Sequence, residues 1–365
     1  MPDAMTPKER WLAALRLEPV DRIPFWPKLD GAYPRHREGR FADADLDSLH
    51  EWIGSDRHEP MDSALTARRT TTSVDMRRDG DTRVTTFGVP GREMRRVDQF
   101  DNHSQAWHPV RFPMHDLADI RGMTAWYSDA EWRIDEDRLR AAEERYQTLG
   151  DDCLMFTCFG QSPLMHWVEW LAGIENAHYL LKDHPAEVSE LFEAMHGGLV
   201  RCAELLAERS PADAAYLSEN TSTTLISVEQ YRGLNKPHIM EYARVLADGP
   251  PHLVLHMCGH LKALLPDLAE VPCRGFESFT RPTLGNTTLE DGRSVCRDKC
   301  LVGGTQAMDW LRPAREIIGI IESALEPLPH HRGIVVTSAG VMPPYCEPET
   351  IREVCRWLAG HAARN

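Results

Sequence analysis

The second half of the chain alternates between short apolar segments and longer segments with helical spacing. Strongly apolar stretches occupy residues 153–158, 214–217, 252–258, 275–279, 300–306 and 333–338. Between them, apolar residues recur every three or four positions, which is typical of helices that bury one face. Strands that alternate with helices pair in parallel, because each helix returns the chain to the edge where the next strand begins. The pattern therefore predicts an α/β fold built on a parallel sheet.

An earlier strand, around Ile23, raises the number of strand and helix units to seven. We expect an eighth strand between residues 60 and 130, and eight such units close naturally into a TIM (β/α)8 barrel. An open doubly wound sheet is the alternative, but no glycine-rich phosphate loop follows any of the predicted strands. The length of 365 residues suits a single barrel domain that spans residues 1–365.

Two features extend this barrel. At the N-terminus, Thr6 is a predicted N-cap, Pro7 opens a helical segment and Glu9 completes a capping box. Residues 70–97 change to the alternating period of strands, with turns near Gly80 and Gly91. We expect three strands there, at 71–76, 83–87 and 93–97, which form a β-meander excursion from the barrel.

Charge and composition narrow the classes of partner. The formal net charge is −15, so no basic patch is expected that would neutralise nucleic-acid phosphates. No run of eighteen apolar residues occurs, and the N-terminus lacks the layout of a signal peptide. We therefore expect a cytoplasmic protein that binds neither nucleic acid nor membranes. Nine cysteines in such a protein favour reduced thiols and a metal over disulfides.

A nitrogen and sulfur pair lies where one apolar strand ends. His256 and Cys258 precede Gly259, and side chains two positions apart on a strand share a face. The loop after the strand at 333–338 is expected to deliver Cys346 to the same end of the sheet. One imidazole and two thiolates suit Zn²⁺, with the fourth position left for water or substrate. The alternative is structural, because buried cysteines and hydrogen-bonded histidines are common in protein cores.

Such a ligand set limits the chemistry of the metal. A zinc ion with an exchangeable position either acidifies a bound water or holds an incoming thiol as its thiolate. Cysteine-rich ligation donates charge to the metal and favours the nucleophilic thiolate. Thiol alkylation therefore ranks above hydrolysis.

Other polar side chains fall at the carboxyl ends of the predicted strands, where barrel enzymes hold their substrates. Glu277 is expected to neighbour His256 and Cys258, as a fourth zinc ligand or as a catalytic base. For Glu219 and Asn220, substrate binding competes with structural capping of the next helix. The candidate substrate-binding residues are Asp30, Tyr33, Phe159, Gln161, Glu219, Asn220 and Gln306.

The sequence resembles the uroporphyrinogen decarboxylase superfamily over nearly its whole length, and specifically its zinc-dependent corrinoid methyltransferase branch, which includes the methylcobalamin:coenzyme M methyltransferases. The resemblance rests on Met5-Thr6-Pro7-Lys8-Glu9-Arg10, Pro19-Val20-Asp21-Arg22-Ile23-Pro24, Leu255-His256-Met257-Cys258-Gly259, Leu301-Val302-Gly303-Gly304 and Cys346 followed by Pro348-Glu349-Thr350. It implies a TIM barrel and a zinc site on His256, Cys258 and Cys346.

The sequence also departs from parts of the superfamily. Uroporphyrinogen decarboxylases carry an arginine-rich Met-Arg-Gln-Ala-Gly-Arg motif after the first strand, whereas residues 26–33 of this chain lack it. The D-x-H-x-x-G motif of corrinoid carrier domains is absent too, so a corrinoid has to arrive on a separate carrier protein or as free cobalamin.

We therefore expect a zinc-dependent methyltransferase that moves a methyl group between a corrinoid co-substrate, such as methylcobalamin, and a thiol or another small acceptor. The first alternative is a demethylase that transfers a methyl group from a methoxylated or methylated small substrate to cob(I)alamin. Porphyrinogen decarboxylation, and a non-catalytic zinc barrel that binds a corrinoid protein, rank below both. The oligomeric state is left open, with a homodimer as one option.

Overall fold

In the computed structural model, which describes residues 4–29, 31, 33, 41, 43–247, 249 and 251–365, eight strands form one parallel sheet. Their order around the sheet is β1–β14–β13–β12–β11–β10–β9–β2. The two outermost strands almost close the ring, since the peptide N–H of Asp56 donates to the carbonyl oxygen of Phe25 at 2.9 Å. The predicted TIM barrel is confirmed. The barrel strands are β1 (Phe25–Trp26), β2 (Arg57–Met61), β9 (Cys153–Gly160), β10 (Ala214–Ser218), β11 (His252–His256), β12 (Gly275–Phe279), β13 (Cys300–Gly304) and β14 (Ile334–Thr337).

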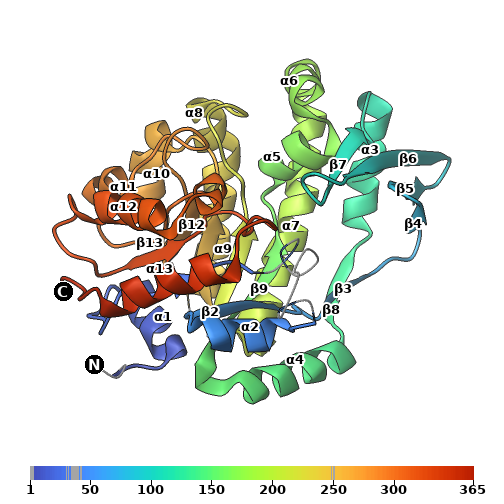
Figure 1. The fold of residues 1–365 in the computed structure, drawn as a ribbon. Coiled ribbons are helices and arrows are strands. Elements are labelled where there is room, and N and C mark those ends of the chain that lie inside the picture. Colours follow the sequence, from blue (N-terminus) through green and yellow to red (C-terminus); the bar gives the residue numbers. More distant parts are fainter. Residues whose placement is uncertain are drawn as a thin grey trace.

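Helices surround this sheet on its outer side (Figure 1). In the described part of the chain, no helix combines the length and the apolar character needed to cross a membrane. The α-helices are α1 (Pro7–Leu15), α2 (Leu46–Ile53), α3 (Leu117–Ser128), α4 (Glu136–Leu149), α5 (Pro163–His166), α6 (Ile174–Asp183), α7 (Pro185–Arg209), α8 (Val228–Gln230), α9 (Lys236–Leu246), α10 (Leu265–Ala269), α11 (Leu289–Val295), α12 (Ala314–Leu325) and α13 (Pro348–Gly360). Short 3-10 or π-helical turns lie at η3 (Gly150–Asp152), η4 (Trp167–Leu171), η5 (Tyr231–Asn235), η6 (Lys262–Leu264) and η7 (Ala307–Leu311).

Alternate side chains of the strands fill the barrel interior, and α1 packs against them. The predicted capping box of α1 is present: Thr6 Oγ1 accepts from the Glu9 N–H, and Glu9 Oε2 accepts from the Thr6 N–H at 2.8 Å. A cap of this kind contributes about 1 kcal/mol to helix stability. The interior cluster consists of Trp11, Ala14, Leu15, Trp26, Leu154, Phe156, Ala214, Tyr216, Val254, Cys300, Val302 and Val335.

The eighth strand of the barrel is β2, which starts before the interval from 60 to 130 in which we expected it. Its sequence, Arg-His-Glu-Pro-Met, has no apolar run, so periodicity gives no strand signal there. Polar contacts stabilise the strand instead. His58 is 3 % exposed, its Nδ1 lies 2.9 Å from the Leu154 carbonyl oxygen, and its Nε2 lies 2.8 Å from the Tyr216 hydroxyl.

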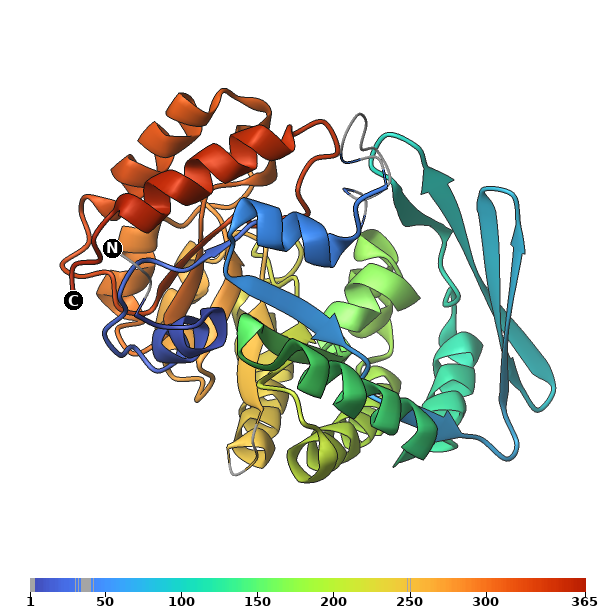
Figure 2. The same ribbon diagram turned by 60° about the horizontal axis from the view of Figure 1, so that its bottom comes forward.

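The β-meander is confirmed, and it continues into a fourth strand. Its strands β4 (Ser73–Asp79), β5 (Thr82–Val89), β6 (Arg92–Asp101) and β7 (Ala106–Arg111) pair antiparallel in sequence order. A short antiparallel pair, β3 (Leu65–Arg68) with β8 (Glu131–Ile134), connects the meander to the barrel. The sheet and α3 stand to one side of the barrel (Figure 2). We call residues 65–134 the insertion.

Candidate metal and substrate site at the barrel mouth

The polar site lies where β10, β11 and β12 end. Val254 belongs to the interior cluster, so His256, two positions later on the same strand, also faces the barrel interior. Ser218, His256 and Glu277 are register partners on the three neighbouring strands. Strand β11 ends at His256, two residues before the predicted strand end at Cys258, so the two side chains are not brought together by a shared strand face. The thiol nevertheless lies beside the ring, close enough to raise the pKa of His256.

His256 is held between a carboxylate and a thiol. Its Nδ1 pairs with Glu277 Oε2, and its ring also contacts the Cys258 side chain. Burial lowers the pKa of the imidazole, but the Glu277 carboxylate and the Cys258 contact outweigh burial and raise the pKa of His256 to about 9. A carboxylate on one ring nitrogen is the arrangement that fixes the tautomer and the orientation of metal-binding histidines.

Glu277 is buried, and both of its carboxylate oxygens have partners. Its Oε1 accepts from Lys28 Nζ at 3.0 Å and from Ser278 Oγ at 2.9 Å, while Oε2 pairs with His256. Burial raises the pKa of this carboxyl group, but Lys28 and His256 together hold it well below its usual range. These contacts favour an orienting role for Glu277. The prediction that Glu277 is a fourth zinc ligand is not tested, and the partners on both of its oxygens do not favour it.

Cys346 lies on the loop between β14 and α13, and the loop is tied to the segment after β1. Tyr33 Oη donates to the Cys346 carbonyl oxygen at 2.9 Å, and the Met342 N–H donates to the Lys28 carbonyl oxygen at 3.0 Å. The Cys346 thiol is 3.8 Å from the Glu347 carbonyl oxygen, and burial raises its pKa to about 12. Among the residues that the structure describes, no three His, Cys, Asp or Glu side chains gather closely enough to hold a metal ion. The three-ligand zinc site therefore stays a prediction.

Asn220 connects the Cys258 thiol to the partly buried carboxylate of Glu169, which Gln161 also contacts. Cys258 Sγ lies 3.4 Å from Asn220 Oδ1, and Asn220 Nδ2 donates to Glu169 Oε2 at 3.2 Å. Gln161 Nε2 donates to the same Glu169 oxygen at 2.8 Å. Burial raises the pKa of Glu169. Asn220 adopts a left-handed backbone conformation, with φ of 48°, which its short polar side chain tolerates.

Glu219 serves the framework of the site. Its carboxylate accepts from the Ser162 N–H at 2.7 Å, from Ser162 Oγ at 2.8 Å and from Asn235 Nδ2 at 2.9 Å. Burial raises the pKa of this carboxyl group, and its contacts hold the start of α5 and the π-turn η5 together. These contacts support the structural alternative for Glu219, in which it caps a helix. The helix that it caps is α5, which follows β9, and not the next helix after β10.

Of the remaining candidates, Phe159 lies at the end of β9 and Gln306 after the end of β13. Phe159 is buried with its ring centroid 6.0 Å from that of Tyr242. Gln306 is half-buried after β13, where its N–H donates to the Asp309 carboxylate at 3.0 Å. Asp30 lies outside the described residues.

Lys28, Glu169 and Asn235 take part in the site although sequence patterns do not identify them. Lys28 lies in the segment 26–33 that lacks the arginine motif, and the segments that contain Glu169 and Asn235 carry no motif of the site. The one usable signal was for Glu169, a carboxylate inside the Trp-rich segment 166–170, where burying it requires partners.

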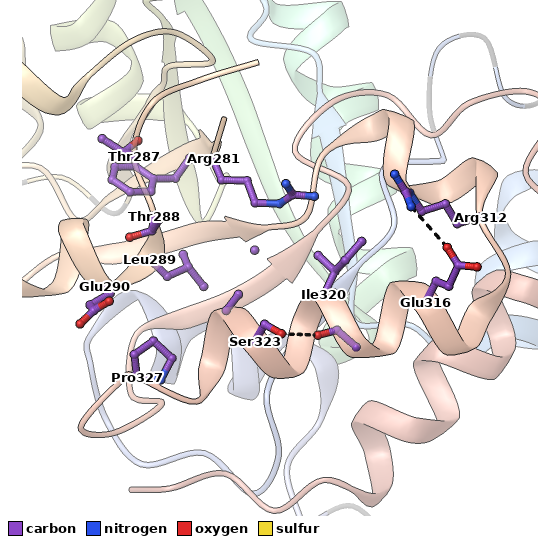
Figure 3. A pocket seen from close by; sticks show the side chains of 14 residues that line it. Arg281, Thr287, Thr288, Leu289, Glu290, Arg312, Glu316, Ile320, Ser323 and Pro327 are labelled. Atoms are coloured by element: carbon purple, nitrogen blue, oxygen red, sulfur yellow. Dashed lines mark hydrogen bonds and ion pairs between the residues drawn. The ribbon is translucent and has the colours of Figure 1, made fainter. Parts of the chain in front are cut away.

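Two cavities flank the barrel mouth. The larger, of about 980 Å³, lies between the insertion and the end of β9, and Phe159 and Gln161 are part of its wall. We call it the insertion cavity. The second, of about 640 Å³, lies among Arg281, the start of α11 and the outer face of α12, and Figure 3 shows Arg312 paired with Glu316 on its rim. None of the predicted zinc ligands lines either cavity.

The fold and this polar mouth define a TIM-barrel protein of the kind that binds small molecules at the carboxyl ends of its strands. Residues 159–360, more than half of the chain, match the family model for uroporphyrinogen decarboxylase (URO-D). The protein belongs to the uroporphyrinogen decarboxylase family.

Comparison with solved structures supports the same fold. A methyltransferase from Methanosarcina mazei is 15 % identical, the match covers 98 % of each chain, and the TM-score is 0.61. A Listeria monocytogenes protein named for vitamin-B12 independent methionine synthase is 14 % identical over 59 % of this chain and 65 % of its own, with a TM-score of 0.40, which is too low to carry an argument. No protein of curated function matches the sequence.

Proposed function

We propose that this protein is a zinc-dependent methyltransferase that moves a methyl group between a corrinoid and a thiol or another small acceptor. The observation that carries the proposal is the His256 ring, which contacts the Cys258 thiol while its Nδ1 pairs with the buried Glu277 carboxylate. Family membership and the fold shared with the Methanosarcina mazei methyltransferase support it.

The side chains present fit a zinc ion by their chemistry. His256 and Cys258 are one nitrogen and one sulfur donor in contact, and Glu277 occupies Nδ1, which leaves the other ring nitrogen for a metal. Cys346 is the proposed third ligand, carried by the loop that Tyr33 and Lys28 hold at the barrel mouth. When bound there, zinc would keep an acceptor thiol in its thiolate form at neutral pH.

The chain's own residues orient the ligands and exclude water. Lys28 compensates the charge of Glu277, and Glu277 fixes the imidazole ring of His256. Asn220 lies next to the Cys258 thiol and is itself held by Glu169. Lys28, Glu277 and Cys346 are each less than a tenth exposed, so interactions among these groups act in a low dielectric.

A second candidate function is demethylation of a methoxylated or methylated small substrate, with cob(I)alamin as the acceptor. The specific observation in its favour is the insertion cavity, because 980 Å³ with an aromatic wall exceeds what a small thiol fills. In both versions the corrinoid is a co-substrate that arrives on a carrier protein or free in solution.

The test is the anaerobic visible spectrum of methylcobalamin mixed with zinc-loaded protein, scanned across a panel of thiols and tetrahydrofolate. Conversion to cob(I)alamin by one acceptor supports the first proposal, provided that Cys258→Ala abolishes it and Cys202→Ala, a buried cysteine on α7, does not. The reverse assay mixes cob(I)alamin with methoxylated donors and tests the second candidate. No reaction in either direction, from protein that holds one zinc, contradicts both.

A further inference from the structure

The walls of the insertion cavity combine aromatic rings with positive charge. Among the described residues that line it, the only charged side chains are Arg69 and Arg96, and no Asp or Glu takes part. A cavity wall with positive but no negative side chains is unusual in a chain whose net charge is −15. His166 adds no positive charge, because burial lowers its pKa to about 4 and leaves the imidazole neutral. The apolar part of the wall includes Phe87, Trp126, Tyr127, Trp132, Phe159 and Met195.

Arg69 forms no ion pair with any carboxylate that the structure describes, although the charge of Asp129 acts on it from nearby. Its guanidinium lies 3.4 Å from the centroid of the Trp126 ring and donates to the Trp126 carbonyl oxygen. Within the described chain no carboxylate forms an ion pair with it. The nearby Asp129 carboxylate instead accepts hydrogen bonds from Thr70 and Thr72. Arg96, by contrast, pairs with Asp98 at 3.2 Å. Arginine has five donors and stays charged in proteins, so most of the hydrogen-bonding capacity of Arg69 is left for a ligand.

Thr85 supplies a second unpaired polar group on the same wall. The residue is 7 % exposed, and its hydroxyl has no hydrogen-bond partner among the described residues. A buried hydroxyl without a partner costs free energy, which a ligand that accepts or donates a hydrogen bond would recover.

We propose that the insertion cavity binds an organic anion with an aromatic body, whose carboxylate pairs with Arg69 and whose ring packs among Trp126, Trp132 and Phe159. The volume of 980 Å³ lies in the range of ligand pockets. Gln161 is part of the cavity wall and shares Glu169 with Asn220, the neighbour of Cys258, so the ligand lies beside the proposed transfer site. Naming this anion as the organic reactant rests on the proposed function, whereas binding itself does not.

The test compares 2-naphthoate with 2-naphthamide, which has nearly the same shape and no charge, by isothermal titration calorimetry on the full chain. We expect the carboxylate to bind about tenfold or more tightly, because a charge-assisted hydrogen bond is lost in the amide. This first comparison requires no variant. Equal affinities for the two compounds would overturn the proposal.

Variants then locate the site. Arg69→Gln is expected to abolish the preference for naphthoate, and Arg69→Lys to retain part of it. Arg77→Gln, on the exposed face of β4 with 86 % of its side chain accessible, is the matched control and should bind as the unaltered chain does. Thr85→Val keeps the shape of the wall and should weaken the binding of naphthoate several-fold.

An unchanged preference for naphthoate in Arg69→Gln would place the anion elsewhere and contradict the proposal. If naphthoate binds but no methyl transfer is detected, the proposed function is contradicted and the anion site is not. If methyl transfer is detected but naphthoate and naphthamide bind equally well, the anion site is contradicted and the proposed function is not.

Discussion

Lys28 Nζ donates a hydrogen bond of 3.0 Å to Glu277 Oε1, which joins the segment after the first barrel strand to the end of β12. The two side chains are 10 % and 1 % exposed, so the pair is buried at the barrel mouth. Glu277 in turn pairs with His256. The orientation of the proposed metal ligand thus depends on a residue 228 positions earlier in the chain, and that dependence can be measured.

Replacement of Lys28 should destabilise the protein strongly. Lys28→Met leaves the negative charge of the buried Glu277 carboxylate without its lysine partner. Breaking a buried ion pair in this way lowers the free energy of unfolding by about 3–5 kcal/mol. Urea unfolding of the two proteins measures the difference. Lys262→Met is the matched control, because Lys262 pairs with Asp291 at a site where its side chain is 60 % exposed, and it should cost less than about 1 kcal/mol. Equal losses in the two variants would contradict the structural role of the Lys28 pair.

Glu277→Gln should weaken zinc binding without abolishing it. If Glu277 orients His256 and is not itself a ligand, its loss should reduce metal affinity about 10–100-fold, as for other carboxylates that support a metal-binding histidine. Competition with a chromophoric chelator measures the affinity. His256→Ala should lose the metal almost entirely, and a Glu277→Gln protein as defective as His256→Ala would instead identify Glu277 as a ligand.

Stability should fall as the pH drops below 6.5, and His58 should account for part of the slope. Burial lowers the pKa of His58 to about 3, although its hydrogen bond to Leu154 acts in the opposite direction. A base whose folded-state pKa is depressed contributes fully above its unfolded pKa of about 6.5, and the contribution is lost as the pH falls toward the folded value. His58→Phe should therefore lower the slope of unfolding free energy between pH 6 and 5 by about 1 kcal/mol per pH unit. An identical slope in both proteins would show that His58 is not buried in its neutral form.

Much of the fold could be predicted from the sequence, because most of its strands are apolar and end at glycines or polar loops. The strands at β9 to β14 gave strong signals, and parallel register then placed Glu277 beside His256. Strand β2 gave none, since polar contacts of Arg57, His58 and Glu59 hold it in place of apolar burial.

Prediction of the site was weaker for a physical reason. Its contacts join residues far apart in sequence, such as Lys28 with Glu277, through side chains on irregular segments. Lys28 has a left-handed φ of 46°, and Cys258 lies beyond the end of its strand, so neither position follows from a strand period. The net charge of −15 did not predict an anion-binding cavity, because it does not show that Arg69 and Arg96 both line the insertion cavity.

X-ray absorption at the zinc edge of the purified, zinc-loaded protein tests whether His256, Cys258 and Cys346 hold the metal. We expect one zinc per chain with two sulfur neighbours at about 2.3 Å and one imidazole nitrogen at about 2.0 Å. Cys346→Ala should leave a single sulfur, and Cys202→Ala should leave the spectrum unchanged. A protein that binds no zinc, or a zinc surrounded by oxygen in place of sulfur, would contradict the assignment of His256, Cys258 and Cys346 as its ligands.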